Sequence, residues 1–111
     1  MNLRQVSDTL SVCPQLTSSD IAGVVDAGFK SIVCNRPDGE EGAQPMYGEI
    51  ELAAKHAGLE IRYVPVTAGA ISEDNVSEFS QALKELPTPI LAYCRSGARC
   101  AMLWSLCEDG S

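Results

Sequence analysis

The residues best suited to chemistry lie together near the end of the chain, in the segment 93–100, Tyr-Cys-Arg-Ser-Gly-Ala-Arg-Cys. Apolar residues flank the segment on both sides, so Cys94, Arg95 and Arg99 fall where a buried strand would pass into a helix. A short loop containing Gly97 at a helix N-terminus gathers backbone N–H groups and the positive end of the helix dipole around an anion. The same surroundings lower the pKa of a thiol. The segment therefore predicts a nucleophilic Cys94 thiolate that acts on an anionic substrate.

A plainer interpretation makes Cys94 one more buried thiol and the two arginines surface residues of a first helical turn, since buried free cysteines are common. Two features favour the functional interpretation. Gly97 within the turn indicates a special backbone conformation, and an arginine at the start of a helix has the wrong sign for the helix dipole unless an anion binds there. We therefore predict that Cys94 and Arg99 are catalytic.

The residues between these two are predicted to bind the anion: Arg95, Ser96, Gly97 and Ala98. Backbone N–H groups from Ser96 to Arg99 would stabilise the negative charge. Cys100, six positions after Cys94, is a candidate resolving thiol if Cys94 is oxidised, although a small core residue on the last helix is the favoured interpretation. Met102 and Trp104 are predicted to lie in the core.

The rest of the chain must position this loop, and it alternates strand and helix patterns. The expected elements are a hairpin over 4–12, a helix over 17–28, a strand over 29–34, a helix over 49–57, a strand over 59–66, a helix over 72–86, a strand over 90–93 and a helix over about 99–107. An acidic, glycine-rich loop is expected over 38–48. Arg36, just before it, is expected either to reach the Cys94 site or to form a salt bridge to Glu40 or Glu41. The pattern predicts a single α/β domain over residues 1–111, with a mostly parallel central sheet flanked by helices and an N-terminal β-hairpin.

Composition limits the partners and the compartment. The chain has 111 residues and a net charge of −7, with eight Lys and Arg and no basic run, which argues against a nucleic-acid partner. No stretch approaches the roughly eighteen apolar residues of a membrane span, and the start lacks the apolar core of a signal peptide. Five cysteines without paired spacing and a single histidine predict no metal site and no cofactor. We expect a cytoplasmic protein with reduced thiols and no membrane partner.

Several short segments along nearly the whole chain carry a family resemblance. They are Arg4-Gln5-Val6, Pro14-Gln15-Leu16, Asn35-Arg36-Pro37-Asp38-Gly39-Glu40-Glu41, Gln44-Pro45, Pro65-Val66 and Ala92-Tyr93-Cys94-Arg95-Ser96-Gly97-Ala98-Arg99. The chain resembles the beta-lactamase-hydrolase-like, phosphatase-like domain family, relatives of the dual-specificity phosphatases. The resemblance implies the cysteine-phosphatase topology. It also implies a fused or interacting persulfide dioxygenase-type domain as a possible partner, and the family is described both as phosphatase-like and as a sulfurtransferase.

The length of the cysteine loop departs from the phosphatase pattern. Cysteine-dependent phosphatases have His-Cys followed by five residues and then Arg, whereas here four residues separate Cys94 from Arg99. Cys100 stands where the phosphatase arginine would fall, and Tyr93 replaces the histidine. A Cys-Arg-Ser-Gly-x-Arg loop resembles that of many rhodaneses, whose smaller loop holds a persulfide or thiosulfate sulfur. The loop therefore favours sulfur chemistry.

The acid needed for phosphate-ester cleavage is also missing from its usual place. In dual-specificity phosphatases an aspartate shortly after the Pro-Val strand end protonates the departing oxygen. Here the residues 67–70 that follow Val66 include no carboxylate. Asp38 is the possible general acid if the protein is a phosphatase, although a turn residue is the favoured interpretation. Sulfur transfer needs no such acid.

Three functions follow from these residues. The favoured one is a rhodanese-like sulfurtransferase, in which Cys94 takes a sulfane sulfur from thiosulfate or a small persulfide such as glutathione persulfide and passes it to a thiol or cyanide. The main alternative is a tyrosine or dual-specificity type phosphatase, in which a phosphate ester forms a phosphocysteine on Cys94. The third is a non-catalytic anion-binding or redox-sensing domain. In each enzyme the substrate is a small anion.

Overall fold

The computed structural model describes residues 2–109. Its strands are β1 (Arg4–Gln5), β2 (Leu10–Cys13), β3 (Ser31–Cys34), β4 (Glu60–Tyr63) and β5 (Ile90–Tyr93). Its helices are η1 (Ser18–Asp20), a 3-10 turn, and α1 (Ile21–Asp26), α2 (Tyr47–His56), α3 (Glu73–Glu85) and α4 (Ala98–Asp109). None of the helices within these residues is both long and apolar enough to cross a membrane.

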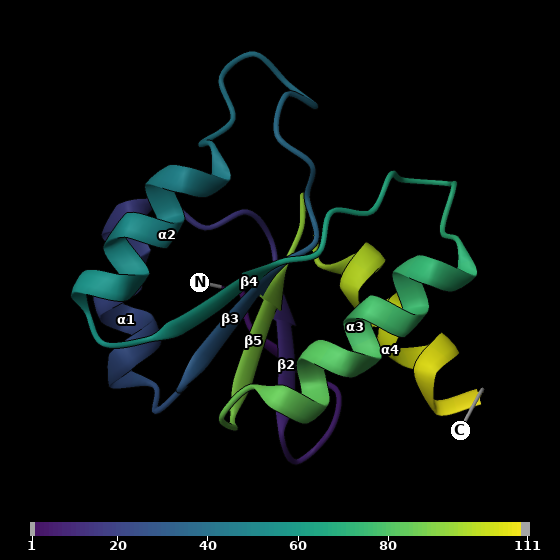
Figure 1. Cartoon of the computed structure of the whole chain (residues 1–111). Helices are drawn as coiled ribbons and strands as arrows, with labels where there is room; N and C mark the ends of the chain where they lie inside the picture. The colour runs from purple at the N-terminus through teal and green to yellow at the C-terminus, as the bar shows by residue number, and fades with distance from the viewer. Residues whose placement is uncertain (1, 110–111) are drawn as a thin grey trace.

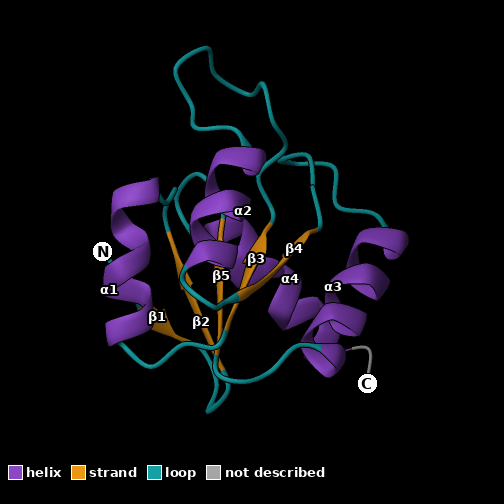
Figure 2. Cartoon of the chain, turned by 60° about the vertical axis from the view of Figure 1, so that its left-hand side comes forward, coloured by secondary structure: helices purple, strands orange, loops and turns teal. Residues whose placement is uncertain are grey.

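The strands form one sheet in the order β1-β2-β5-β3-β4. β1 pairs with β2 antiparallel, which completes the N-terminal hairpin, and the remaining pairs are parallel. Helices α1 and α2 cover one face of the sheet, and α3 and α4 cover the other (Figures 1 and 2). The predicted α/β fold, with its mostly parallel sheet and N-terminal hairpin, is confirmed.

Strand β5 lies between β2 and β3, and its residues alternate between two hydrophobic clusters. Leu91 and Tyr93 pack with α1 and α2, while Ile90 and Ala92 pack with α3 and α4. A strand that is buried on both faces must be apolar at every position, which explains the unbroken apolar run before the cysteine. The same alternation places Cys94 on the α3 and α4 side, at the carboxyl end of the central strand.

Two helices begin differently from the sequence prediction. The helix expected over 17–28 opens with the 3-10 turn η1, where the Asp20 carboxylate accepts the backbone N–H of Thr17 at 2.8 Å, and α1 proper spans only six residues. Helix α2 begins at Tyr47, two residues before the predicted start. Its cap is supplied from outside the helix: Asp38 Oδ1 accepts the Tyr47 N–H at 2.7 Å. A cap nine positions upstream leaves no local signal in the sequence.

Candidate active site

The loop between β5 and α4 is fixed to the end of β2. The backbone N–H of Cys94 donates to the Cys13 carbonyl at 3.4 Å, and the N–H of Gln15 donates to the Arg95 carbonyl at 3.3 Å. Gly97 has a φ of +93°, and a Cβ on it would lie 3.3 Å from the Cys13 carbonyl carbon. Glycine is therefore required here both by its backbone angle and by the close approach of a second strand.

Cys94 is the nucleophile candidate, and its surroundings favour the thiolate. Its sulfur accepts the Gly97 N–H at 3.0 Å. The pKa of Cys94 is lowered to about 5, first by the S–H of Cys100 and then by backbone N–H groups of Cys100, Ser96 and Gly97, although burial opposes the shift. A pKa of about 5 means that the side chain is ionised at neutral pH. The thiolate was predicted from the helix N-terminus and the neighbouring arginines, but the first cause is the thiol of Cys100 and no arginine is among the main causes of the shift.

The other four cysteines behave in the opposite way. Burial raises the pKa of Cys13 to about 12 and that of Cys34 to about 11, and it also raises the pKa values of Cys100 and Cys107. All five are free thiols. No group of three or more His, Cys, Asp or Glu side chains suited to a metal ion occurs within residues 2–109. One thiol of the five is thus prepared for nucleophilic attack.

Arg99 lies in the first turn of α4, and its guanidinium spans the carboxyl ends of two strands. Nη1 donates to the Val66 carbonyl at 2.9 Å and to the Asn35 carbonyl at 3.5 Å. The same group is paired with Glu40: Nη1 lies 2.9 Å from Oε2, and Nη2 lies 3.3 Å from Oε1. A carboxylate of the chain therefore holds the guanidinium that we predict to bind the substrate anion.

Glu40 and its neighbour Glu41 connect three arginines. Arg36, with only 5% of its side chain exposed, contacts Glu40 at 3.0 Å and Glu41 at 3.1 Å, so both of the predicted alternatives for its salt bridge occur. Arg95 pairs with Glu41 at 2.9 Å. Burial works to raise the pKa of Glu40, but hydrogen bonds from Arg99 and Arg36 outweigh it and hold that pKa below its ordinary value. Glu40 is thus an ionised partner of the arginines and is not protonated, so it cannot act as a general acid.

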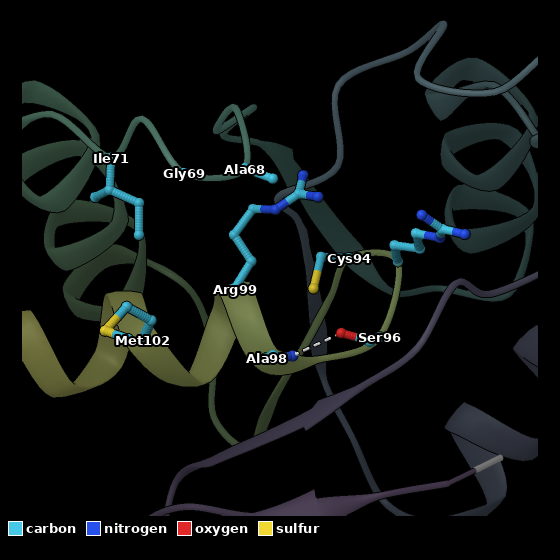
Figure 3. Close-up of a pocket in the computed structure, with 9 residues that line it drawn as sticks. Ala68, Gly69, Ile71, Cys94, Ser96, Ala98, Arg99 and Met102 are labelled. Carbon is cyan, nitrogen blue, oxygen red and sulfur yellow. Dashed lines mark hydrogen bonds between the residues drawn. The ribbon is translucent and has the colours of Figure 1, made fainter.

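A cavity of about 420 Å³ opens above Cys94 (Figure 3). Its lining joins the predicted loop to a second segment, and comprises Ala68, Gly69, Ile71, Cys94, Arg95, Ser96, Ala98, Arg99 and Met102. Ala68, Gly69 and Ile71 were not predicted as site residues, and their position beyond the end of a strand was the available signal. The prediction for Met102 was wrong as well, because this residue was expected in the core but is 54% exposed and faces the cavity.

The loop backbone is used somewhat differently from the prediction. Ser96 Oγ accepts the Ala98 N–H at 3.3 Å, so that N–H is already engaged within the loop. The N–H groups that lower the pKa of Cys94 come from Ser96, Gly97 and Cys100. Ser96 and Ala98 still line the cavity. Gly97 does not line it but lies against the backbone of Cys13.

Gly97 and Cys100 lie behind the cavity lining next to Cys94, whereas Asp38 is a predicted site residue that neither lines the cavity nor hydrogen-bonds to Cys94. Its carboxylate caps α2 through Tyr47, and its own N–H donates to the Tyr63 hydroxyl at 2.9 Å. Asp38 therefore lies in a turn, as the favoured interpretation predicted, and its carboxylate is not placed to act as a general acid on a substrate in the cavity. The residues that line the cavity include no carboxyl group.

An α/β sheet with a cysteine loop at the carboxyl end of its central strand, followed by a helix N-terminus and an arginine, defines a domain built around a nucleophilic cysteine and an anion site. The family model for the "Beta-lactamase hydrolase-like protein, phosphatase-like domain" matches residues 2–111, and the chain belongs to this family.

Known proteins similar to the chain agree with this class. A "Beta-lactamase hydrolase-like protein" of Xylella fastidiosa is 32% identical over 108 residues, which cover 97% of this chain and 25% of that protein. A crystal structure from Neisseria meningitidis Z2491, described as a candidate phosphatase, is 39% identical with a TM-score of 0.87 and covers 94% of this chain and 74% of its own. The chain thus spans about a quarter of the curated relative it matches.

More distant structures show the fold alone. The core catalytic domain of the PP-IP phosphatase SIW14 from S. cerevisiae has a TM-score of 0.64 at 15% identity, over 98% of this chain and 75% of its own. Together these comparisons make the chain a phosphatase-like domain with a cysteine-phosphatase fold. They support the phosphatase alternative of the sequence analysis better than its favoured sulfurtransferase.

Proposed function

We propose that the chain is a cysteine-dependent hydrolase of phosphate monoesters. The observation that carries the proposal is a thiolate with a pKa of about 5 at the base of a cavity that two arginines also line. Thiolate nucleophiles of lowered pKa are typical of covalent catalysis, and guanidinium groups bind phosphoryl oxygens well. The family and fold support the phosphoryl substrate.

In this mechanism the Cys94 sulfur attacks phosphorus, an S–P bond forms, and the P–O bond to the leaving group breaks with its electron pair on oxygen. Arg99 releases the Glu40 carboxylate and binds the phosphoryl oxygens instead. A water molecule then attacks phosphorus and loses a proton to the solvent, the S–P bond breaks with its electron pair on sulfur, and phosphate leaves with the thiolate restored. In this second step, when the thiolate leaves phosphorus, the loop N–H groups stabilise the negative charge on sulfur.

The cavity restricts the leaving group. With no carboxyl group in its lining and Glu40 held ionised by two arginines, no side chain there is prepared to protonate a departing alkoxide. Esters whose leaving group departs as a stable anion, such as aryl phosphates, are therefore the expected substrates.

The test is turnover of para-nitrophenyl phosphate by the wild-type chain and by Cys94→Ser. We expect phosphate release in the wild type, a phosphocysteine on Cys94 after acid quenching, and at least a roughly thousand-fold loss in the variant. Absence of turnover in the folded wild-type protein would overturn the proposal.

Sulfur transfer is the second candidate, and the absence of a carboxyl group from the cavity favours it. Attack of Cys94 on the outer sulfur of thiosulfate breaks the S–S bond and releases sulfite, which needs no proton from the protein. The resulting persulfide then passes its terminal sulfur to cyanide or a thiol, and the thiolate is regenerated. Mass spectrometry of Cys94 after thiosulfate treatment, with a thiocyanate assay, separates this candidate from the phosphatase.

A further inference from the structure

One side of the cavity is apolar and is used by neither mechanism above. Ile71, just before α3, and Met102, on α4, lie on one side of the cavity, with Arg99 between them and Cys94 in the view of Figure 3. Ile71 also packs against the hydrophobic core, which fixes its position. Met102 is 54% exposed, and its unbranched thioether side chain adapts to irregular apolar partners. An apolar surface next to a nucleophile provides a place for the part of a substrate that does not react.

The charges around the cavity cancel. Arg36, Arg95 and Arg99 are balanced by the carboxylates of Glu40 and Glu41 and by the Cys94 thiolate. The whole chain carries a net charge of −7. A substrate with several anionic groups would thus meet no excess of positive charge, whereas a single anionic head could replace one carboxylate on an arginine.

We infer that Ile71 and Met102 form an apolar subsite, which selects substrates with one anionic head joined to an uncharged apolar group about the size of an aromatic ring. The cavity of about 420 Å³ is near the lower end of the roughly 300–1,000 Å³ of small-molecule sites, in keeping with a head group and one ring. This subsite rests on the proposed function, which supplies the anionic head of the substrate. It concerns binding alone, so it can be tested without turnover.

The experiment measures protection of Cys94 from iodoacetamide at pH 6.5, where the other cysteines stay protonated. Phenylphosphonate, methylphosphonate and methylenebisphosphonate serve as unreactive probes. We expect phenylphosphonate to protect at about ten-fold lower concentration than methylphosphonate, because one ring leaves water, and the bisphosphonate to protect no better than methylphosphonate.

Two variants locate the subsite. Met102→Gln and Ile71→Ala should weaken protection by phenylphosphonate about three- to ten-fold and leave protection by methylphosphonate unchanged. Leu106→Gln is the control, because it removes an exposed apolar side chain from the same helix outside this cavity. Met102 is exposed, so its variant should fold even if Ile71→Ala is unstable.

The inference is overturned if wild-type protein shows no preference for phenylphosphonate, if the bisphosphonate protects best, or if Met102→Gln weakens both monophosphonates equally. These outcomes are separate from failure of the proposed function. A preference for phenylphosphonate that depends on Met102, found in a protein that hydrolyses no phosphate ester, would reject the hydrolase and leave the apolar subsite standing.

Discussion

At the scale of single residues, the low pKa of Cys94 has several causes, and a neighbouring thiol comes before the backbone N–H groups of the loop. Cys100 is buried and protonated, and its S–H is the largest cause of the low pKa of Cys94. Hydrogen bonds to a thiolate stabilise it relative to the thiol. We therefore expect Cys100, the residue at the position of the phosphatase arginine, to tune the nucleophile through its S–H.

We predict that alkylation of Cys94 by iodoacetamide has its half-maximal rate near pH 5, because a lowered pKa keeps the thiolate at every pH above that value. Cys100→Ala should move the midpoint upward, toward the roughly 8.5 of a free cysteine, while Cys100→Ser keeps a donor and should move it less. Peptide mass spectrometry across a pH series measures the midpoint. An unchanged midpoint in Cys100→Ala would show that the loop N–H groups suffice.

A second prediction concerns Glu40, which occupies the guanidinium of Arg99 in a two-point contact. Glu40→Gln removes a carboxylate that an incoming anion must displace. We expect several-fold tighter binding of methylphosphonate, measured by protection of Cys94. Glu85→Gln is the matched control, because Glu85 is half exposed and its arginine partner, Arg62, does not line the cavity. Weaker binding of methylphosphonate to Glu40→Gln would contradict this expectation. It would mean that Glu40 holds Arg99 in position and does not compete with the anion for its guanidinium.

Among the elements, the loop from β5 to α4 depends most on one residue type. Gly97→Ala would place a methyl group 3.3 Å from the Cys13 backbone at a φ of +93°. We expect a loss of about 1–2 kcal/mol in the free energy of unfolding by urea, together with slower alkylation of Cys94. Gly42→Ala is the control, since a Cβ at that position would have no atom within 4 Å and the φ of Gly42 is not positive. Equal stability of both variants would contradict this account.

The order of the elements could be predicted because each strand is a short apolar run and each helix has an apolar stripe between turn residues. The loop chemistry could be predicted as well, since Cys94, Gly97 and Arg99 are close in sequence. The contact of Glu40 with Arg99 joins residues 59 positions apart, and the exposure of Met102 depends on where α4 meets the segment after β4. Tertiary contacts of this kind leave no local pattern.

At the scale of the whole molecule, the acidic net charge and the balanced site predict a weak response to salt. Salt screens the long-range interaction between a protein and an anionic substrate, and here the balanced site gives no attraction while the net charge of −7 gives only a repulsion, so added salt should lower KM slightly. We predict that KM for an aryl phosphate changes less than about two-fold between roughly 0.02 and 0.15 M ionic strength, set with potassium gluconate. A steep rise in KM would indicate a positive surface that the described residues do not reveal.

The chain covers about a quarter of its curated relative, so the partner domain expected from the family resemblance and the cytoplasmic location stay predictions. Expression of this domain beside a persulfide dioxygenase-type protein would show whether the two associate.

The attachment of the catalytic loop to β2 gives the N-terminal strands a part in the chemistry. Because the loop hydrogen-bonds to Cys13 in β2 and to Gln15 just after it, we expect the loop to lose its shape when β2 leaves the sheet. Alkylation of Cys94 at low pH therefore reports on that strand. If this alkylation is lost during partial unfolding while the helices persist, the loss marks the point at which β2 leaves the sheet.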